Sequence, residues 1–187
     1  DVNQPLYDVL MPFIRQCAGP VDYTQGAMNN AARGHFRANY SEPMSMGTRC
    51  HQLAEYMVFD SPLCMLCDTP INYRREPECT RFIASVPTVW DETRVLDGSV
   101  GEYIVTARRK GDEWYVGAIC SWESRSIRID LGFLDDGLWN AEIFRDGVNA
   151  SRNGTDYIRE FREVGHGTAI EFELAPGGGV AVKLVRK

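Results

Sequence analysis

Two carboxylates stand out among the residues that could do chemistry, because of where they fall in the chain. Asp22 closes a predicted short strand over residues 21–24, and Glu42 lies in a loop over residues 33–47 that lacks clear periodicity. If that strand belongs to a (β/α)8 barrel, its C-terminal end and the following loop lie on the face that carries the active site. Contact with a substrate and a structural role in ordering the loop both fit these positions.

The three histidines show no partner for nucleophilic catalysis. There is no G-x-S-x-G motif, and no Ser or Cys stands at a suggestive spacing from His35, His51 or His166. His51 falls on the polar side of a predicted helix and His166 falls in a glycine turn, so we expect both at the surface. His35 lies in the long loop, where its role stays open.

The cysteines favour ordinary thiols over a metal or redox site. Cys64 and Cys67 form a C-x-x-C pair, but a structural zinc site needs four ligands, and neither a second C-x-x-C nor an H-x-x-x-H is present. The pair also lies within an apolar, strand-like run, whereas a thioredoxin-like motif opens a helix. We therefore expect buried thiols, with a redox or metal protein as the weakest alternative, and the sequence leaves open whether Cys64 and Cys67 are free.

Composition indicates a folded protein and argues against two classes of partner. Of the 187 residues, 44% are hydrophobic and 25% are charged, and the net charge of −6 works against binding a phosphate backbone, so we expect no nucleic acid partner. No apolar run approaches the roughly 18 to 20 residues that span a bilayer, so we expect no membrane span. The chain begins at Asp1 and runs straight into an apolar-periodic segment, which looks like a cut in a longer protein.

The first half alternates helices with strand-like segments. Apolar residues at helical spacing predict helices over residues 5–17, 47–59 and 78–84. Pro12 falls inside the first of these, which is therefore either one kinked helix or two short pieces. The continuous apolar run 63–67 predicts a strand buried on both faces, as in a parallel sheet. Such alternation builds α/β sheets, but two strands are too few to stand alone, so partner strands must come from outside this chain.

The second half is built of short strands. Strand patterns occur over residues 103–108, 113–119, 126–131, 139–144, 168–174 and 180–185. A hairpin turn joins the first two. Seven or eight strands spaced by roughly 8 to 12 residues predict an antiparallel β-sandwich without helices. The predicted fold class is therefore α/β plus all-β, with an α/β part over residues 1–87 and the antiparallel sandwich domain over residues 88–187.

Several segments together resemble the C-terminal third of glycoside hydrolase family 97. They are residues 11–15, 18–20, 22–28 (DYTQGAM), 56–63, 82–83, 86–93 (VPTVWDET), 103–105, 108–109, 114–117 and 175–179 (APGGG). The matches are spread over nearly the whole chain, and the run within 86–93 is the specific one. The resemblance implies a parent with an N-terminal β-sandwich, a central (β/α)8 TIM barrel and a C-terminal β-domain associated with oligomer contacts. Residues 1–87 would then form the C-terminal segment of the barrel, and residues 88–187 the last domain.

The resemblance also implies a function for that parent, the hydrolysis of terminal α-linked sugars with the help of a calcium ion. Retention requires a nucleophile and an acid/base about 5 Å apart, whereas inversion leaves room for a water between the two carboxyl groups. The run 23–28 resembles the retaining, α-galactosidase-like branch, and the segment around 5–7 lacks a Glu of the inverting, α-glucosidase-like branch. The catalytic carboxylates and calcium ligands are expected upstream. We therefore assign no catalytic or metal residue to this chain and expect it to be inactive alone.

Position alone makes five residues candidates for lining the active-site mouth: Asp22, Tyr23, Thr24, Gln25 and Glu42. The expected partners are an α-galactoside or related oligosaccharide, the N-terminal part of the same protein and a second copy of it. The expected location, which rests on the resemblance only, is the periplasm or cell surface of a Gram-negative bacterium.

The main alternative is a non-catalytic β-sandwich module that binds carbohydrate or self-associates. Its contacts would come from the aromatic side chains of Trp114, Tyr115, Trp122 and Trp139. Aromatics at alternating strand positions are more often core residues than a binding platform, however, so the core interpretation is favoured. An inverting α-glucosidase of the same family remains a second alternative for the parent.

Overall fold

A computed structural model describes residues 3–187 of the chain. Within that range the helices all precede residue 86: α1 (Gln4–Leu10), a 3₁₀ turn (Gln16–Ala18), α2 (Arg49–Val58), α3 (Pro70–Arg75) and α4 (Pro77–Ser85). Thr48 begins α2, because its hydroxyl accepts a hydrogen bond from the His51 amide at 3.1 Å and so satisfies a free N–H at the helix start. Phe59, in an extended conformation, ends it.

The described strands form two antiparallel sheets and one short parallel pair. They are β1 (Asn30–Ala31), β2 (Ser45–Met46), β3 (Glu92–Ser99), β4 (Tyr103–Lys110), β5 (Glu113–Cys120), β6 (Arg125–Asp130), β7 (Trp139–Asp146), β8 (Tyr157–Val164), β9 (Ala169–Leu174) and β10 (Gly179–Arg186). The larger sheet has the order β3-β4-β5-β10-β7-β8, the smaller one pairs β6 with β9, and β1 pairs with β2 in parallel.

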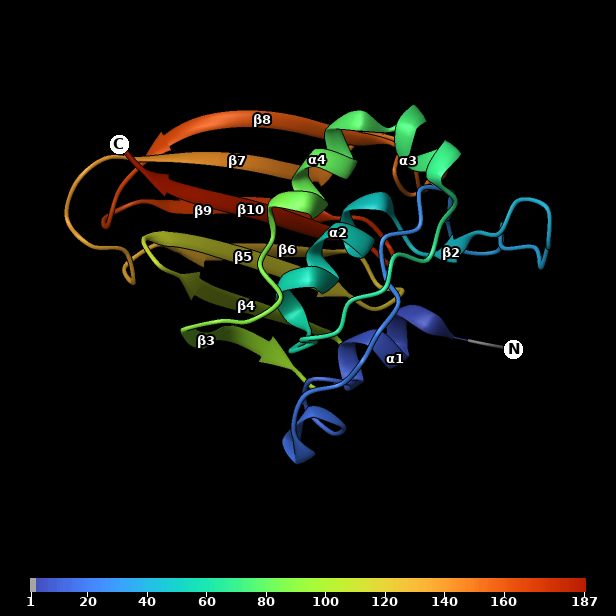
Figure 1. Cartoon of the computed structure of the whole chain (residues 1–187), viewed down its shortest axis with the longest axis horizontal. Coiled ribbons are helices and arrows are strands. Elements are labelled where there is room, and N and C mark those ends of the chain that lie inside the picture. Colours follow the sequence, from blue (N-terminus) through green and yellow to red (C-terminus); the bar gives the residue numbers. More distant parts are fainter. Residues whose placement is uncertain (1–2) are drawn as a thin grey trace.

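Both faces of the six-stranded sheet are covered, which gives three layers (Figure 1). On β5, Trp114 and Val116 belong to the core that the sheet shares with β6 and β9. Tyr115 and Ile119 point to the opposite face, where they pack under the helices. The period of two along a strand produces this division, and it explains why β5 is buried over most of its length.

Helix α2 lies directly on β5 because a glycine allows a close approach. A Cβ atom at Gly117 would lie 2.6 Å from the carbonyl oxygen of Ala54 and 3.0 Å from the Cβ of Met57. All ten residues of α2 are buried. The predicted helix over residues 47–59 is therefore confirmed, but the polar face expected for it does not reach the surface.

The apolar run 63–67 is not a strand buried on both faces. In the described chain it contributes one isolated parallel bridge, between Tyr23 and Cys64. Leu63, Met65 and Leu66 keep 60%, 49% and 54% of their surface exposed. A run of this kind is buried on both faces only where other strands and helices cover it, and residues 3–187 supply no such cover here.

Of the two forms predicted for residues 5–17, the structure has the two short pieces. Helix α1 ends at Leu10, and after a stretch of turns only the 3₁₀ turn at Gln16–Ala18 follows. Pro12 has no N–H to donate to the preceding turn, so a helix cannot run through it with all its hydrogen bonds. The other short helix, expected over residues 78–84, is confirmed as α4.

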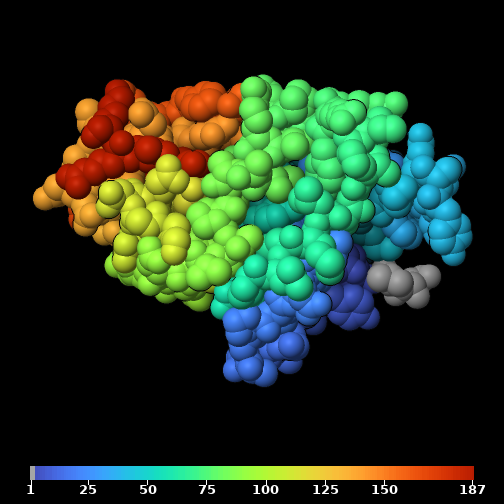
Figure 2. Space-filling model, viewed as in Figure 1, coloured from blue at the N-terminus to red at the C-terminus, as the bar shows by residue number. Residues whose placement is uncertain are grey.

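The antiparallel β-sandwich is confirmed. Eight strands lie in the described residues after 88, as the spacing predicted, and they include the edge strands β3 and β8, whose patterns gave no signal of their own. The barrel origin of residues 1–87 and the division of the chain at residue 87 stay predictions. Figure 2 shows the segment before β2, in light blue, standing out from the body of the molecule. No described helix is both long enough and apolar enough to span a membrane.

Candidate functional site

A pocket of about 600 Å³ lies between α1, the segment before β1 and the loop that leads to β2. Its walls come from Gln4, Asp22, Tyr23, Thr24, Ala27, Phe36, Pro43, Met44, Ser45, Met46, Gln52, Cys67 and Asp68. Three of the five candidate residues, Asp22, Tyr23 and Thr24, are thus brought together in one concave surface. This surface is the candidate site in the described chain.

The other two candidates lie elsewhere. Gln25 is completely buried, because side chains alternate along the extended segment, and its amide nitrogen lies 3.4 Å from the Sγ of Cys64. Glu42 lines a separate, smaller pocket of about 240 Å³ beside Asn72 and Arg75. A contact of either side chain with a ligand in the larger pocket is not supported by this geometry.

Tyr23 is held firmly in the pocket wall. Its hydroxyl donates to Oδ1 of Asp8 at 2.7 Å and accepts from the amide of Gln4 at 2.6 Å. Its ring packs edge-on against Phe59, with 4.7 Å between the centroids. Burial, together with the nearby carboxylates of Glu55 and Asp8, raises the pKa of Tyr23, so the phenol keeps its proton and acts as a donor.

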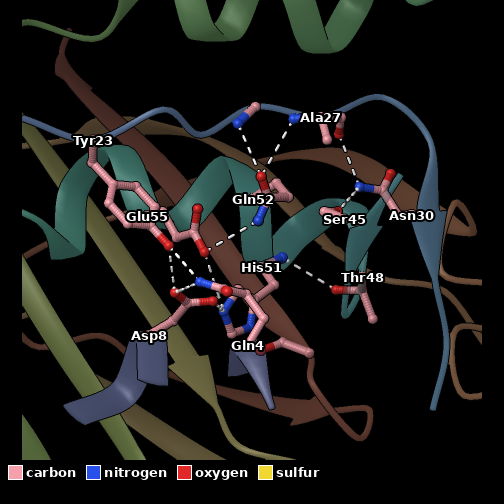
Figure 3. A network of polar contacts seen from close by, with 12 residues as sticks. Gln4, Asp8, Tyr23, Ala27, Asn30, Ser45, Thr48, His51, Gln52 and Glu55 are labelled. Carbon is pink, nitrogen blue, oxygen red and sulfur yellow. Dashed lines mark hydrogen bonds and ion pairs between the residues drawn. The ribbon is translucent and has the colours of Figure 1, made fainter. Parts of the chain in front are cut away.

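Behind this wall lies a completely buried cluster of Asp8, His51 and Glu55 (Figure 3). The Nε2 of His51 is 3.3 Å from Oδ2 of Asp8 and 3.4 Å from Oε1 of Glu55. On the other side of the ring, Nδ1 lies 3.2 Å from the carbonyl oxygen of Gly178, just before β10. The cluster therefore joins α1, α2 and the β-domain.

The cluster carries balanced charge. Burial by itself lowers the pKa of His51, but the facing carboxylates of Asp8 and Glu55 outweigh it and raise that pKa to about 10. Burial and the charge of Asp8 raise the pKa of Glu55. An imidazolium at His51 and a proton retained near Glu55 together avoid an uncompensated buried charge, which would be costly.

The surface position expected for His51 is therefore wrong. The prediction rested on the spacing of apolar residues in α2, which cannot show that α1 and the turn at Gly178, 127 residues away, close over the polar side of the helix. Asp8 and Glu55 were missed for the same reason. The available signal was the i, i+4 spacing of His51 and Glu55, which places both on one helix face.

The pocket floor is fixed by side chains that satisfy loop backbone groups. Oε1 of Gln52 accepts from the amides of Gly26 and Ala27, at 3.0 and 3.3 Å, while its amide nitrogen donates to Glu55. The buried Arg49 binds the carbonyl oxygen of Met28 and Oδ1 of Asn30. These contacts hold the extended segment 25–30 against α2 without regular secondary structure.

The expectation of buried thiols holds for Cys50, Cys79 and Cys120, and all six thiols are free. It is wrong for Cys17, which is exposed, and for Cys64 and Cys67, which are partly exposed because the described residues do not cover the run 63–67. His166 is exposed as expected, and His35 is exposed in the loop. The core interpretation of the aromatics holds for Trp114, Tyr115 and Trp139, which are at most 3% exposed, while Trp122 is only partly buried.

The profile described as "Glycosyl-hydrolase 97 C-terminal, oligomerisation" matches residues 89–185, which is more than half of the chain. The chain belongs to glycoside hydrolase family 97. A "Retaining alpha-galactosidase" of Bacteroides thetaiotaomicron is 60% identical over 183 residues, which cover 98% of this chain and 28% of that protein. The chain thus spans little more than a quarter of this relative's length.

Two solved structures have the same arrangement of elements. A family 97 enzyme from Pseudoalteromonas sp., determined in complex with acarbose, matches with a TM-score of 0.87 and 36% identity, covering 98% of this chain and 29% of its own. A beta-arabinopyranosidase matches with a TM-score of 0.77 and 27% identity, covering 97% of this chain and 28% of its own. The fold described above is therefore shared with enzymes that are more than three times as long.

The calcium ion implied by the resemblance to family 97 does not fit the buried cluster. Asp8, His51 and Glu55 bring three possible metal-ligand atoms within 4.8 Å of one another. Among the described residues, this is the group of His, Cys, Asp or Glu side chains that could hold a metal ion. Calcium takes six to eight oxygen ligands, however, and an imidazole nitrogen is not one of them. The described residues therefore offer no calcium site at this cluster.

Proposed function

We propose that this chain is the C-terminal part of a retaining α-galactosidase, in which the catalytic carboxylates lie outside residues 1–187. The observation that carries the proposal is the 60% identity to a retaining alpha-galactosidase over 98% of the chain. The substrate class is a terminal α-linked galactoside. The pocket bounded by Asp22, Tyr23 and Thr24 forms part of the mouth through which the sugar enters.

In this proposal, residues 1–87 complete a (β/α)8 barrel whose other strands precede them in the full-length protein. The parallel contacts β1–β2 and Tyr23–Cys64 are of the kind that such a barrel contains. The exposed apolar side chains of Leu63, Met65 and Leu66 are the surface that the preceding strands and helices cover. Calcium, if it is the cofactor, binds to ligands in that preceding part.

The stereochemistry of hydrolysis tests the proposed reaction. Full-length protein is mixed with p-nitrophenyl α-galactoside, and the first sugar released is followed by proton NMR before it mutarotates. Retention predicts that α-galactose appears first, because two successive displacements restore the starting configuration. If β-galactose appears first, or if only the α-glucoside is cleaved, the retaining α-galactosidase assignment is wrong.

Calcium dependence and location follow the same proposal. Chelation of calcium is expected to abolish hydrolysis by the full-length protein, and calcium is expected to restore it. Fractionation of the source cells should place the protein in the periplasm or at the cell surface. Activity that is unchanged by a chelator would remove calcium from the proposal and leave the reaction class standing.

A second function, self-association through the β-domain, has its own support. The family profile that matches residues 89–185 names oligomerisation in its description. The edge strand β8 presents Phe161 with 65% of its surface exposed, and Arg159 and Arg162 beside it pair with glutamates. Sedimentation equilibrium of the full-length protein and of its Phe161→Glu variant tests this role, since a contact through β8 predicts dissociation in the variant.

A further inference from the structure

The buried cluster of Asp8, His51 and Glu55 touches the candidate pocket at three points. Gln4 and Tyr23, both in the pocket wall, donate to the same oxygen, Oδ1 of Asp8, each at 2.7 Å. Gln52, in the floor, donates to Oε1 of Glu55 at 3.1 Å. Figure 3 shows these pocket side chains converging on the two carboxylates.

The opposite side of the cluster is anchored in the β-domain. The His51 ring reaches the carbonyl oxygen of Gly178, and a Cβ at Gly179 would lie 2.7 Å from the Cα of His51, so backbone and helix are in contact there. Asp146 fixes the same turn by accepting from the amides of Ala175 at 2.9 Å and Gly179 at 3.1 Å. The β10 turn thus sets the position of the imidazole.

We propose that Asp8, His51 and Glu55 are positioning residues that hold Gln4, Tyr23 and Gln52 in the geometry needed to bind the sugar, and that they transmit this geometry from the β10 turn. The inference deepens the proposed function and rests on it for the identity of the ligand. Nδ1 of His51 faces the carbonyl oxygen of Gly178, and Nε2 lies within ion-pair distance of both carboxylates. Because all three side chains are completely buried, they act through the pocket side chains and do not touch the substrate.

The direct test is the geometry of the pocket in variants of the full-length protein. His51→Gln removes the charge of the imidazolium, and Glu55→Gln replaces a carboxyl group that can exchange its proton within the cluster by a fixed amide of similar size. Crystal structures of these variants are expected to show Tyr23 and Gln52 displaced from their present rotamers. Unchanged rotamers in both variants would overturn the proposal, and this readout holds even if the protein proves inactive on α-galactosides.

Kinetics separates positioning from general loss of stability. Met57→Ala is the matched control, because Met57 is completely buried in the same helix but faces β5 and has no polar contact with the cluster. His51→Gln and Glu55→Gln should raise KM for the α-galactoside about tenfold or more with a smaller change in kcat, because they loosen groups that bind the sugar. Met57→Ala should lower the unfolding temperature and leave KM within about twofold.

Other outcomes also bear on the proposal. The positioning role would be contradicted if both cluster variants kept the KM of the wild type, or if Met57→Ala raised KM equally. A tightly bound metal ion in the wild-type protein, one per chain and lost in His51→Gln, would also overturn it, since the trio would then be a metal site. An inactive wild-type protein whose variants still displace Tyr23 would reject the α-galactosidase proposal and retain the positioning role.

Discussion

At the scale of single residues, buried polar groups hold the pocket together. The extended segment that contains Tyr23 and Gln25 has little regular structure, so its backbone groups must find side-chain partners. Gln52 supplies acceptors for two amides, and Arg49 supplies donors for a carbonyl and an amide oxygen. Loss of one such group leaves its partners buried without hydrogen bonds.

Replacing Arg49 should be costly. In Arg49→Met the carbonyl oxygen of Met28 and Oδ1 of Asn30 lose their donor, and Glu76 loses its partner at 3.0 Å, so we expect the free energy of unfolding to fall by about 3 kcal/mol. Urea denaturation followed by circular dichroism measures it. Arg152→Met, at an exposed position, is the control and should change stability by less than about 0.5 kcal/mol. Equal effects of the two changes would refute the argument.

Asp146 should make stability depend on pH. Burial raises the pKa of its carboxyl group from 3.8 to about 6, so the folded chain binds this proton more tightly than the unfolded chain does. The stabilising contribution is therefore complete below pH 4 and is lost as the pH rises to about 6. Relative to the Asp146→Asn variant, the wild type should be more stable at pH 4 than at pH 7 by about 2 kcal/mol. Urea unfolding of both proteins at the two pH values measures this difference, and a constant difference would contradict it.

At the scale of elements, the contact of α2 with β5 decides how the pocket sits on the β-domain. The helix carries Arg49, His51, Gln52 and Glu55 to the pocket side, while its opposite side lies on the sheet. The close approach depends on Gly117, where any side chain would meet the helix backbone. A displacement of α2 would move all four polar residues together.

Gly117→Ala is expected to lower the free energy of unfolding by about 1 to 3 kcal/mol, because the added methyl group overpacks the helix–sheet contact. Thermal unfolding monitored by circular dichroism provides the comparison. Gly167→Ala is the matched control, because a Cβ there meets no atom within 4 Å, and it should be nearly neutral. A stable Gly117→Ala variant would show that α2 and β5 adjust more easily than this packing implies.

The elements also show how far the sequence could lead. Alternation of apolar and polar residues was enough to predict β6 and β9, because their burial repeats every two residues. The edge strand β8 was missed, since its residues are mostly half-exposed and charged and lack that alternation. The run 63–67 has the apolar composition of a buried strand, but the described chain lacks the neighbours that would bury it.

The candidate site could be predicted only in part, for a related physical reason. Asp22, Tyr23 and Thr24 line one pocket and are consecutive in the sequence. Their position at the end of a short predicted strand was enough to group them. His51, Asp8 and Glu55 depend on contacts between segments far apart in the chain. Helical spacing shows which residues share a face, but it does not show what covers that face.

At the scale of the whole molecule, the chain combines a complete β-sandwich with a first half whose apolar surface is partly uncovered. The sandwich has its own core between the two sheets, whereas Leu63, Leu66 and Ile71 remain more than half exposed. Relatives with the same fold are more than three times as long. This uncovered surface supports the proposal that the chemistry belongs to a longer protein of which residues 1–187 are a part.

The decisive experiment compares hydrolysis of p-nitrophenyl α-galactoside, with calcium, by residues 1–187 and by the full-length protein. We expect turnover by the full-length protein only, with the galactoside preferred to the corresponding α-glucoside. Turnover by residues 1–187 alone would contradict this expectation, because a catalytic pair of carboxylates would then have to lie within this chain.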